Sequence, residues 1–395
     1  MSIITKDYRR AGEKPFVDEL IPKIFQLGGS FMLWRLPASN EKNLIVCNTG
    51  GIAQDEITLE GSQSGFAFAP FNPAQRKFFF NADLVFRFKE GEIVEGPDLS
   101  DTTYCTTQTS DIDRQEKKHL RYYTSGKESK ETTDFSSLVS ECIKTIESGA
   151  IEKIVPSKFQ DIDLPQDFDL LKTFNRMCDR HPDAFVSLVS SPDTGTWLGA
   201  SPELLASVDA NEKFKTIALA GTQRYEPRMN LKSVAWTQKE IEEQALVSRY
   251  IINCFKKIRV REYAEHGPRT VVAGSLLHLR TDYEVDTKEV NFPQLGSVML
   301  KLLHPTSAVC GMPLQPALDF LKTNENYDRE FYSGYLGPVN FDSESKLFVN
   351  LRCMQLFEKS ARIYAGAGVT ADSIPEKESE EVEMKINTLS KIINS

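Results

Sequence analysis

The sequence lacks the cysteine spacing of a disulfide framework or of a structural zinc site. Its seven cysteines lie far apart, their number is odd, and no two of them form a Cys-x-x-Cys pair. Disulfide-stapled domains and zinc ribbons depend on such pairs, so the sequence argues against both classes. Unpaired, scattered cysteines indicate a reducing compartment.

Export and membrane signals are also missing. The first 16 residues contain no apolar core of a secretory signal, and no apolar run approaches the length that spans a bilayer. We therefore expect a cytoplasmic protein without a membrane partner.

No glycine-rich phosphate loop is present either. Gly366-Ala-Gly368 lacks the later glycine and the following helix of a dinucleotide fingerprint. The net charge is −9, which argues against a nucleic-acid partner because a phosphate backbone attracts basic surfaces. An anionic small molecule would need a local pocket that supplies cations or a metal ion.

Hydrophobic periodicity predicts both helices and strands along the chain. Asp134 is a plausible N-cap of one helix, and Gly149 a plausible end of it. Helices are expected near 134–149, 167–180, 236–258, 294–303, 314–322 and 375–393. Strands are expected near 43–47, 66–68, 77–80, 151–159, 184–190, 197–200, 204–208, 214–219, 270–279, 332–340, 346–357 and 361–365. The polar stretch 101–134 predicts a loop or linker.

The order of these elements indicates the fold class. A chain of 395 residues allows two or three domains or one large domain. Strands come in meander-like groups that helices interrupt, without a repeating strand–helix–strand unit. This order predicts an α+β fold with antiparallel sheets.

Two pairs of carboxylates stand out on the predicted helices. Glu240 and Glu243 are three residues apart on the helix near 236–258, and Glu378 and Glu381 are three apart on the last helix. Each pair shares one helix face. Facing pairs could hold a divalent cation such as Mg²⁺, which prefers carboxylate oxygens, water and substrate oxygens. The alternative is a solvated charged face.

A lysine and a glutamate are candidates for acid–base chemistry. Lys153 lies in an apolar strand, where it is either a surface lysine or a general base. Glu203 follows a Ser-Pro turn, where it is either a turn residue or a general acid held in an apolar pocket.

Three further positions could contact an anion. Arg352 is a cation inside an apolar strand, and such an arginine tends to have an anionic partner in the protein or in a ligand. Gly366 and Gly368 either bring backbone N–H groups close to an anion or only permit a turn. His278 has apolar neighbours, and a histidine in such a setting is more often a satisfied core residue than a catalyst.

Together, these segments resemble the chorismate-utilising enzymes, which include isochorismate and salicylate synthases and the large subunits of anthranilate and aminodeoxychorismate synthases. The resemblance covers about residues 134–393 and rests on nine motifs in one order. They are IEKIVPSK (151–158), WLGASPELL (197–205), ALAGT (218–222), KEIEEQ (239–244), HPTSAVCGMP (304–313), DREFYSG (328–334), FVNLRC (348–353), YAGAGV (364–369) and PEKESEEVEMK (375–385).

The resemblance implies a single chorismate-binding fold with layered antiparallel sheets and helices packed outside. Residues 134–395 would form the catalytic region, and residues 1–133 would complete the same fold. The chain departs from the usual family residues at four positions, namely Lys158, Gln244, Ser307 and Ser379.

Family roles carry over to matching positions. Lys153 matches the base that activates water, and Glu203 the acid that protonates the departing hydroxyl. Glu243 and Glu381 match the Mg²⁺ ligands, with Glu240 and Glu378 as supporting acidic residues. Positions that match substrate-contacting or pocket residues are Ala220, Gly221, Thr222, His278, Tyr332, Arg352, Gly366, Gly368 and Lys385.

Residues at two positions distinguish the branches of the family. Anthranilate synthases typically carry glutamine in place of Lys153, and aminodeoxychorismate synthases typically carry lysine in place of Ala220. The resemblance therefore implies an isochorismate synthase, an isomerase that acts on chorismate with Mg²⁺ in menaquinone or siderophore biosynthesis. It also implies no amidotransferase subunit, and we expect a monomer. The alternatives are a salicylate synthase and a catalytically silent chorismate-binding protein.

Overall fold

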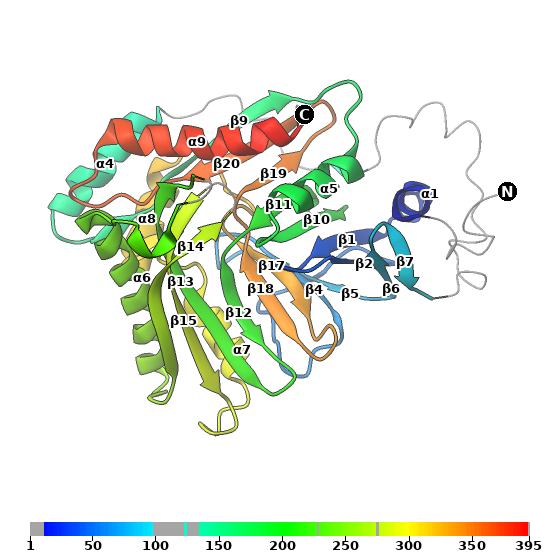
Figure 1. Ribbon diagram of the computed structural model, residues 1–395, viewed down its shortest axis with the longest axis horizontal. Coiled ribbons are helices and arrows are strands. Elements are labelled where there is room, and N and C mark those ends of the chain that lie inside the picture. Colours follow the sequence, from blue (N-terminus) through cyan, green and yellow to red (C-terminus); the bar gives the residue numbers. More distant parts are fainter. Residues whose placement is uncertain (1–11, 98–121, 125–133, 227–228, 274–275, 394–395) are drawn as a thin grey trace.

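Two nine-stranded antiparallel sheets face each other, and helices cover their outer sides (Figure 1). This arrangement is seen in a computed structural model, which describes residues 12–97, 122–124, 134–226, 229–273 and 276–393. The strand pairs within both sheets are antiparallel, as the meander-like order of the sequence predicts.

The first sheet has the strand order β7-β6-β2-β1-β10-β11-β19-β20-β9. In that order its strands are Glu92–Glu95, Leu84–Lys89, Glu41–Cys47, Ser30–Arg35, Phe185–Ser191, Gly195–Ser201, Cys353–Leu356, Ser360–Gly366 and Ser157–Asp163. The second sheet has the order β14-β15-β13-β12-β18-β17-β4-β5-β3. Its strands are Ala264–Ala273, Leu276–Asp286, Lys213–Arg224, Leu204–Val208, Ser345–Val349, Tyr335–Val339, Gly65–Ala69, Lys77–Asn81 and Ile52–Gln54. A separate short pair joins β8 (Lys153–Ile154) to β16 (Gly311–Met312).

Aromatic side chains fill the space between the two large sheets. Trp34 of β1 packs against Phe66 of β4, with 5.5 Å between ring centroids. Phe185 of β10 stacks on Phe348 of β18 at 4.2 Å. Such ring pairs add directional contacts to the burial of a large apolar area, so they fix the distance between the sheets.

Helices bury the outer faces of the sheets. The longer ones are α1 (Glu13–Gln26), α4 (Phe135–Glu147), α5 (Leu170–Arg180), α6 (Gln238–Lys257), α7 (Leu295–Leu303), α8 (Leu314–Asn324) and α9 (Pro375–Ile393), and a short 3-10 helix spans Leu231–Ser233. Helix α9 runs over β20 and β9 beside α4, whereas α6 lies along β13 and β15 (Figure 1). The pocket described below lies between α6 and α9.

Local sequence explains where several helices begin. The Asp134 carboxylate accepts a hydrogen bond from Ser136 N–H, and Gly149, just beyond the helix, has a φ of +88°. Helix α6 starts with a capping box between Thr237 and Glu240. Caps of this kind satisfy N–H groups that have no partner inside the helix.

Several predicted elements need correction. The strand expected near 151–159 is two strands, β8 and β9, because Pro156 supplies no N–H for pairing. The strand expected near 346–357 is also two, and each lies in a different sheet. Between them Arg352 adopts a φ of +47°. Apolar spacing along 236–258 predicts that Ile241 lies near the buried face of that helix, but Ile241 is 47% exposed.

Burial of the strand at residues 65–69 also differs from the prediction. Phe66 and Phe68 alternate with alanines, which predicts a half-buried strand, but all five residues of β4 are buried. The phenylalanines face the core between the sheets, and the alanines join the cluster on the other side. Helix α1 was not predicted at all.

Residues before and after the expected boundary at residue 133 contribute strands to both large sheets. Strand β1 pairs with β10, and β4 pairs with β17. The loop expected at 101–134 lies almost entirely outside the described residues. In the part of the chain that the structure describes, no helix combines the length and apolar character needed to cross a bilayer.

Candidate active site

One pocket gathers most of the predicted site residues. Its walls come from both large sheets and from helices α6 and α9. The predicted residues that line it are Glu203, Ala220, Gly221, Thr222, Glu243, His278, Tyr332, Arg352, Gly366, Gly368, Glu381 and Lys385. These positions are up to 182 residues apart in sequence (385 − 203), so only the tertiary fold brings them together.

Glu203 is a buried carboxylic acid at the pocket wall. It stands between β11 and β12 and is 5% exposed. Burial raises its pKa to about 7, although Lys153, the Thr306 hydroxyl and Arg352 act in the opposite direction. Thr306 Oγ1 lies 3.5 Å from Glu203 Oε1. At neutral pH this side chain can therefore hold a proton and give it to a bound molecule.

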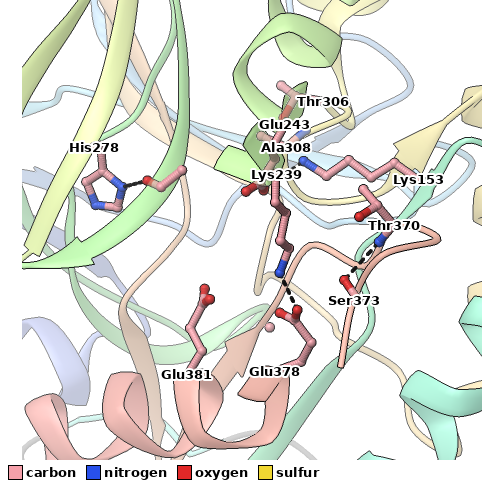
Figure 2. Close-up of polar contacts among 12 residues, drawn as sticks. Lys153, Lys239, Glu243, His278, Thr306, Ala308, Thr370, Ser373, Glu378 and Glu381 are labelled. Carbon is pink, nitrogen blue, oxygen red and sulfur yellow. Dashed lines mark hydrogen bonds and ion pairs between the residues drawn. The ribbon is translucent and has the colours of Figure 1, made fainter. Parts of the chain in front are cut away.

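Lys153 lies directly behind the pocket wall rather than on it. Its side chain is fully buried, and its Nζ lies 3.0 Å from Glu243 Oε1 (Figure 2). Burial alone would raise the pKa of Glu243, but the ammonium groups of Lys153, Lys385 and Lys239 lower it below the ordinary value. Glu243 is thus an anion at the pocket, and Lys153 is the amine nearest to it.

His278 and Arg352 form a chain of hydrogen bonds across the pocket. His278 Nδ1 lies 2.7 Å from the Gly221 carbonyl oxygen, and Arg352 Nη2 lies 2.8 Å from His278 Nε2. Burial, reinforced by Arg352, lowers the pKa of His278 to about 3. The ring is therefore neutral, with Nδ1–H donating to Gly221 and Nε2 accepting from Arg352.

Two cationic side chains, Arg352 and Lys385, line the pocket. Burial lowers the pKa of Arg352 to about 10, with Glu203 acting in the opposite direction, so the guanidinium stays charged. Lys385 Nζ pairs with Glu381 at 2.8 Å and donates to the Gly366 carbonyl at 2.8 Å. An anionic ligand would meet both of these cations.

Gly368 permits the close approach of two charged side chains. A Cβ at this position would lie 2.5 Å from Glu243 Oε1 and 3.0 Å from Lys153 Cε. A side chain here would have to displace the Lys153–Glu243 pair. The absence of a side chain at Gly368 therefore leaves room for this ion pair.

Glu240 and Glu378, also predicted near a metal, lie outside the pocket lining. Glu240 accepts hydrogen bonds from the Thr237 backbone at 2.8 Å and from the Gln223 amide at 2.9 Å. Figure 2 shows Lys239 reaching from α6 to pair with Glu378 on α9. Burial raises the pKa of Glu378, although Lys239 opposes this. Both carboxylates hold the helices around the pocket.

The two carboxylates that do face the pocket are of the chemical type that Mg²⁺ binds. Glu243 comes from α6 and Glu381 from α9, so two hard oxygen donors approach the same space from different elements. Within the described ranges, no group of three or more histidine, cysteine, aspartate or glutamate side chains is placed to hold a metal. Mg²⁺ requires no such group, because it commonly binds through one or two carboxylates and completes its shell with water and substrate oxygens.

Sequence reasoning missed the apolar part of the pocket and one ion pair. The unassigned lining residues are Val155, Pro202, Leu219, Ala308, Leu351, Tyr364, Ala365 and Leu389. All of these residues except Leu389 lie inside the nine motifs. Membership in a motif is the one sequence signal that could have identified them as lining residues. Lys239, the partner of Glu378, also lies in a motif. The four positions that depart from the family pattern are not in the lining.

The fold and the pocket define a class of protein: an α+β protein whose two antiparallel sheets and helices α6 and α9 enclose a small-molecule site with cations, carboxylates and a buried acid. Residues 97–394 match the family described as "Chorismate binding enzyme". The chain belongs to this family, which confirms the predicted resemblance.

Individual relatives are similar over about two thirds of their length. The chain is 29% identical over 264 residues to isochorismate synthase EntC of Escherichia coli (strain K12), covering 66% of each protein. It is 30% identical over 275 residues to isochorismate synthase DhbC of Bacillus subtilis (strain 168), covering 66% of this chain and 67% of the relative. Anthranilate synthase component 1 of Saccharolobus solfataricus is 26% identical over 327 residues, covering 79% of this chain and 72% of the relative.

Solved structures confirm the fold. The menaquinone-specific isochorismate synthase MenF from Escherichia coli aligns with a TM-score of 0.72 at 19% identity, covering 92% of this chain and 88% of that chain. Anthranilate synthase component I from Streptococcus pneumoniae TIGR4 aligns with a TM-score of 0.64 at 16% identity, covering 91% and 90%. The predicted α+β, chorismate-binding fold is therefore correct.

Proposed function

We propose that this protein is an isochorismate synthase, which converts chorismate and water reversibly to isochorismate. The observation that carries the proposal is Glu203, which is buried in the pocket wall with its pKa raised to about 7, while Lys153 is buried directly behind that wall beside Glu243. The similarity to isochorismate synthases EntC and DhbC supports the same reaction.

The proposed reaction uses these two groups as base and acid. The Lys153 ammonium that pairs with Glu243 first releases its proton to solvent, and the resulting amine accepts a proton from water while the water oxygen forms a bond to ring carbon 2. The ring double bond shifts, the bond from carbon 4 to its hydroxyl breaks, and Glu203 gives that hydroxyl a proton. One water enters and one leaves, so the atoms balance. The reverse reaction restores both protonation states.

Charge complementarity supports chorismate as the ligand. Chorismate carries two carboxylates, and the pocket presents Arg352 and Lys385 as cations in a protein of net charge −9. Mg²⁺ held by Glu243 and Glu381 would supply further positive charge for a substrate carboxylate. Tyr332 and Gly368, which also line the pocket, would contact the same ligand.

Two positions favour water over ammonia as the nucleophile. Lys153 is present where anthranilate synthases typically carry glutamine, and Ala220 lines the pocket without an amine of its own. We therefore propose that no amidotransferase subunit is needed and that the protein acts as a monomer in the cytoplasm. The six cysteines in the described residues are free and buried, which suits a reducing compartment. Menaquinone and siderophore pathways both remain compatible with this reaction.

Product analysis tests the reaction itself. We expect the purified protein to form a chorismate–isochorismate mixture with Mg²⁺ and without ammonia, to reach it from either side, and to lose activity with EDTA. Chromatography with mass detection identifies the products. Salicylate with pyruvate would instead establish the salicylate synthase alternative, and chorismate binding without turnover would establish the silent protein.

Removal of one carboxylate tests the magnesium site. Glu381→Gln is expected to weaken Mg²⁺ binding at least about tenfold, because one of two charged ligands is lost. Calorimetric titration with Mg²⁺ alone measures this without turnover. Glu380→Gln is the matched control, since Glu380 is an exposed neighbour on the same helix. Equal Mg²⁺ affinity in the two variants would contradict the assignment of Glu381.

A further inference from the structure

A buried ion pair lies behind the pocket, outside the groups assigned so far. Glu325 follows α8, and Arg329 comes four residues later. Their side chains are 3% and 2% exposed. Arg329 Nε lies 2.7 Å from Glu325 Oε2, and Arg329 Nη2 lies 2.5 Å from Glu325 Oε1. The contact is therefore bidentate, which fixes the orientation of the guanidinium and the carboxylate relative to each other.

The same pair binds the segment that leads away from Lys153. Arg329 Nη2 donates to the Val155 carbonyl at 2.7 Å. Glu325 Oε1 accepts from the Ser157 backbone N–H at 2.8 Å and from the Ser157 hydroxyl at 2.9 Å. These bonds span Pro156, where the sheet pairing is interrupted between β8 and β9. They hold the chain that places Lys153 behind the pocket.

A second segment bound by Arg329 is the loop that faces Glu203. Arg329 Nη1 donates to the Val309 carbonyl at 2.9 Å. In the same loop Ala308 lines the pocket, and Thr306 lies 3.5 Å from Glu203. The backbone N–H of Val155 also donates to Cys310 at 2.9 Å, so the two segments are neighbours.

The guanidinium also contacts the aromatic wall. Its carbon lies 4.2 Å from the ring centre of Phe71 and 5.9 Å from that of Tyr332, which lines the pocket. One side chain thus contacts the Lys153 segment, the loop beside Glu203 and Tyr332.

Stability alone does not require an ion pair at this place. Burying two charges removes them from water, and well-packed apolar side chains of similar volume often serve stability as well or better. Apolar groups, however, cannot hold two backbone carbonyls and one backbone N–H at fixed positions. The Arg329–Glu325 pair therefore holds the backbone at Val155, Ser157 and Val309 in place, which apolar side chains could not do.

We infer that Arg329, held by Glu325, is a positioning residue that keeps the base Lys153 and the acid Glu203 directed at one pocket. This inference rests on the proposed function for its consequence in turnover. The positioning itself concerns only the segments 151–158 and 304–311, so it can be measured without any reaction.

Arg329→Met and Glu325→Gln test the inference against a matched control, Arg35→Met. Arg35 is also buried; besides contacts of 3.4 Å with the Leu36 and Ser39 carbonyls, it donates at 2.5 to 3.1 Å to three more distant carbonyls, those of His181, Pro182 and Ala184. None of these three residues lines the pocket. The control therefore removes a comparable buried guanidinium from another place.

We expect the Arg329 and Glu325 variants to lower kcat for isochorismate formation about 30- to 100-fold with less than about a threefold change in KM, because small misplacements of reacting groups are costly. Backbone hydrogen exchange of 151–158 and 304–311 should accelerate at least about tenfold. Arg35→Met should leave kcat, KM and both exchange rates within about threefold of wild type. If Arg329→Met does not fold, the milder Glu325→Gln carries the test.

The outcomes distinguish the positioning role of Arg329 from the proposed isochorismate synthase function. Folded variants whose kcat and exchange at both segments match Arg35→Met would overturn the positioning role. A wild-type protein that forms no isochorismate, together with faster exchange in the variants, would overturn the proposed function and leave the positioning role supported. Faster exchange with normal kcat would show that the position of these segments does not matter for turnover, which would overturn the inference as stated.

Discussion

Replacing Lys153 with glutamine is expected to lower kcat for isochorismate formation by about 10²–10⁴-fold, the range of a lost general base. Lys153 is fully buried beside Glu243, at 3.0 Å. Glutamine keeps an N–H donor for that carboxylate but cannot accept the proton of water at neutral pH. Steady-state conversion of chorismate with saturating Mg²⁺ measures the effect.

Glutamine is a better choice than alanine at this position. Alanine would leave the largely buried Glu243 carboxylate without the ammonium group that lies 3.0 Å from it, and removing one partner of such a pair is destabilising. Loss of activity in that variant could then reflect unfolding. Lys213→Gln is the control, because it removes a lysine–glutamate pair, with Glu284, whose two residues do not line the pocket. If the Lys153 variant turned over as fast as this control, Lys153 would not be the base.

Replacing Glu203 with glutamine is expected to have an effect of similar size, with a distinct dependence on pH. The proposed acid must carry a proton, and the pKa of Glu203 is about 7. Wild-type kcat should therefore fall as pH rises above about 7. Glutamine has no proton to give, so kcat should be about 10²–10⁴-fold lower and should lose this alkaline decline. A pH series of single-turnover rates measures both features.

The free energy of unfolding should also depend on pH differently in the wild-type protein and in the Glu203→Gln variant. The folded-state pKa of Glu203 is raised from 4.5 to about 7, because burial disfavours the charged form. The stabilising contribution of protonated Glu203 is complete below about pH 4.5 and is lost as pH rises through about 7. Glutamine stays neutral, so the variant should gain stability relative to wild type between pH 5 and pH 8. Urea unfolding at both pH values checks this, and a constant difference would argue against a buried, neutral Glu203.

Local sequence was sufficient for most of the helices and for the fold class. Helix α9 has the predicted bounds, and α4 begins after the predicted cap Asp134, because caps and apolar periodicity act over a few residues. Strand ends were less predictable. The break at Pro156 and the change of sheet at Arg352 depend on which strands are neighbours.

The identities of the candidate site residues came from motifs, and their chemistry came from the fold. Glu203, Lys153 and Arg352 stand in short sequence patterns that resemble one family. Those patterns alone do not predict that the pKa of Glu203 is raised to about 7. They also do not predict the ion pair of Lys153 with Glu243 or the hydrogen bond of Arg352 with His278. These properties require burial and contacts between segments that are distant in the chain.

The sequence by itself determined the class of this protein, most of its helices and the residue types that the proposed reaction needs, because propensity, capping and motif order are local. Only the tertiary structure decided which carboxylates face the pocket. Glu243 and Glu381 line it, whereas Glu240 caps α6 and Glu378 pairs with Lys239. The reason is physical: three-residue spacing places each pair on one face of its helix, but the packing of α6 against β13 and of α9 against β20 decides which residue of the pair reaches the ligand.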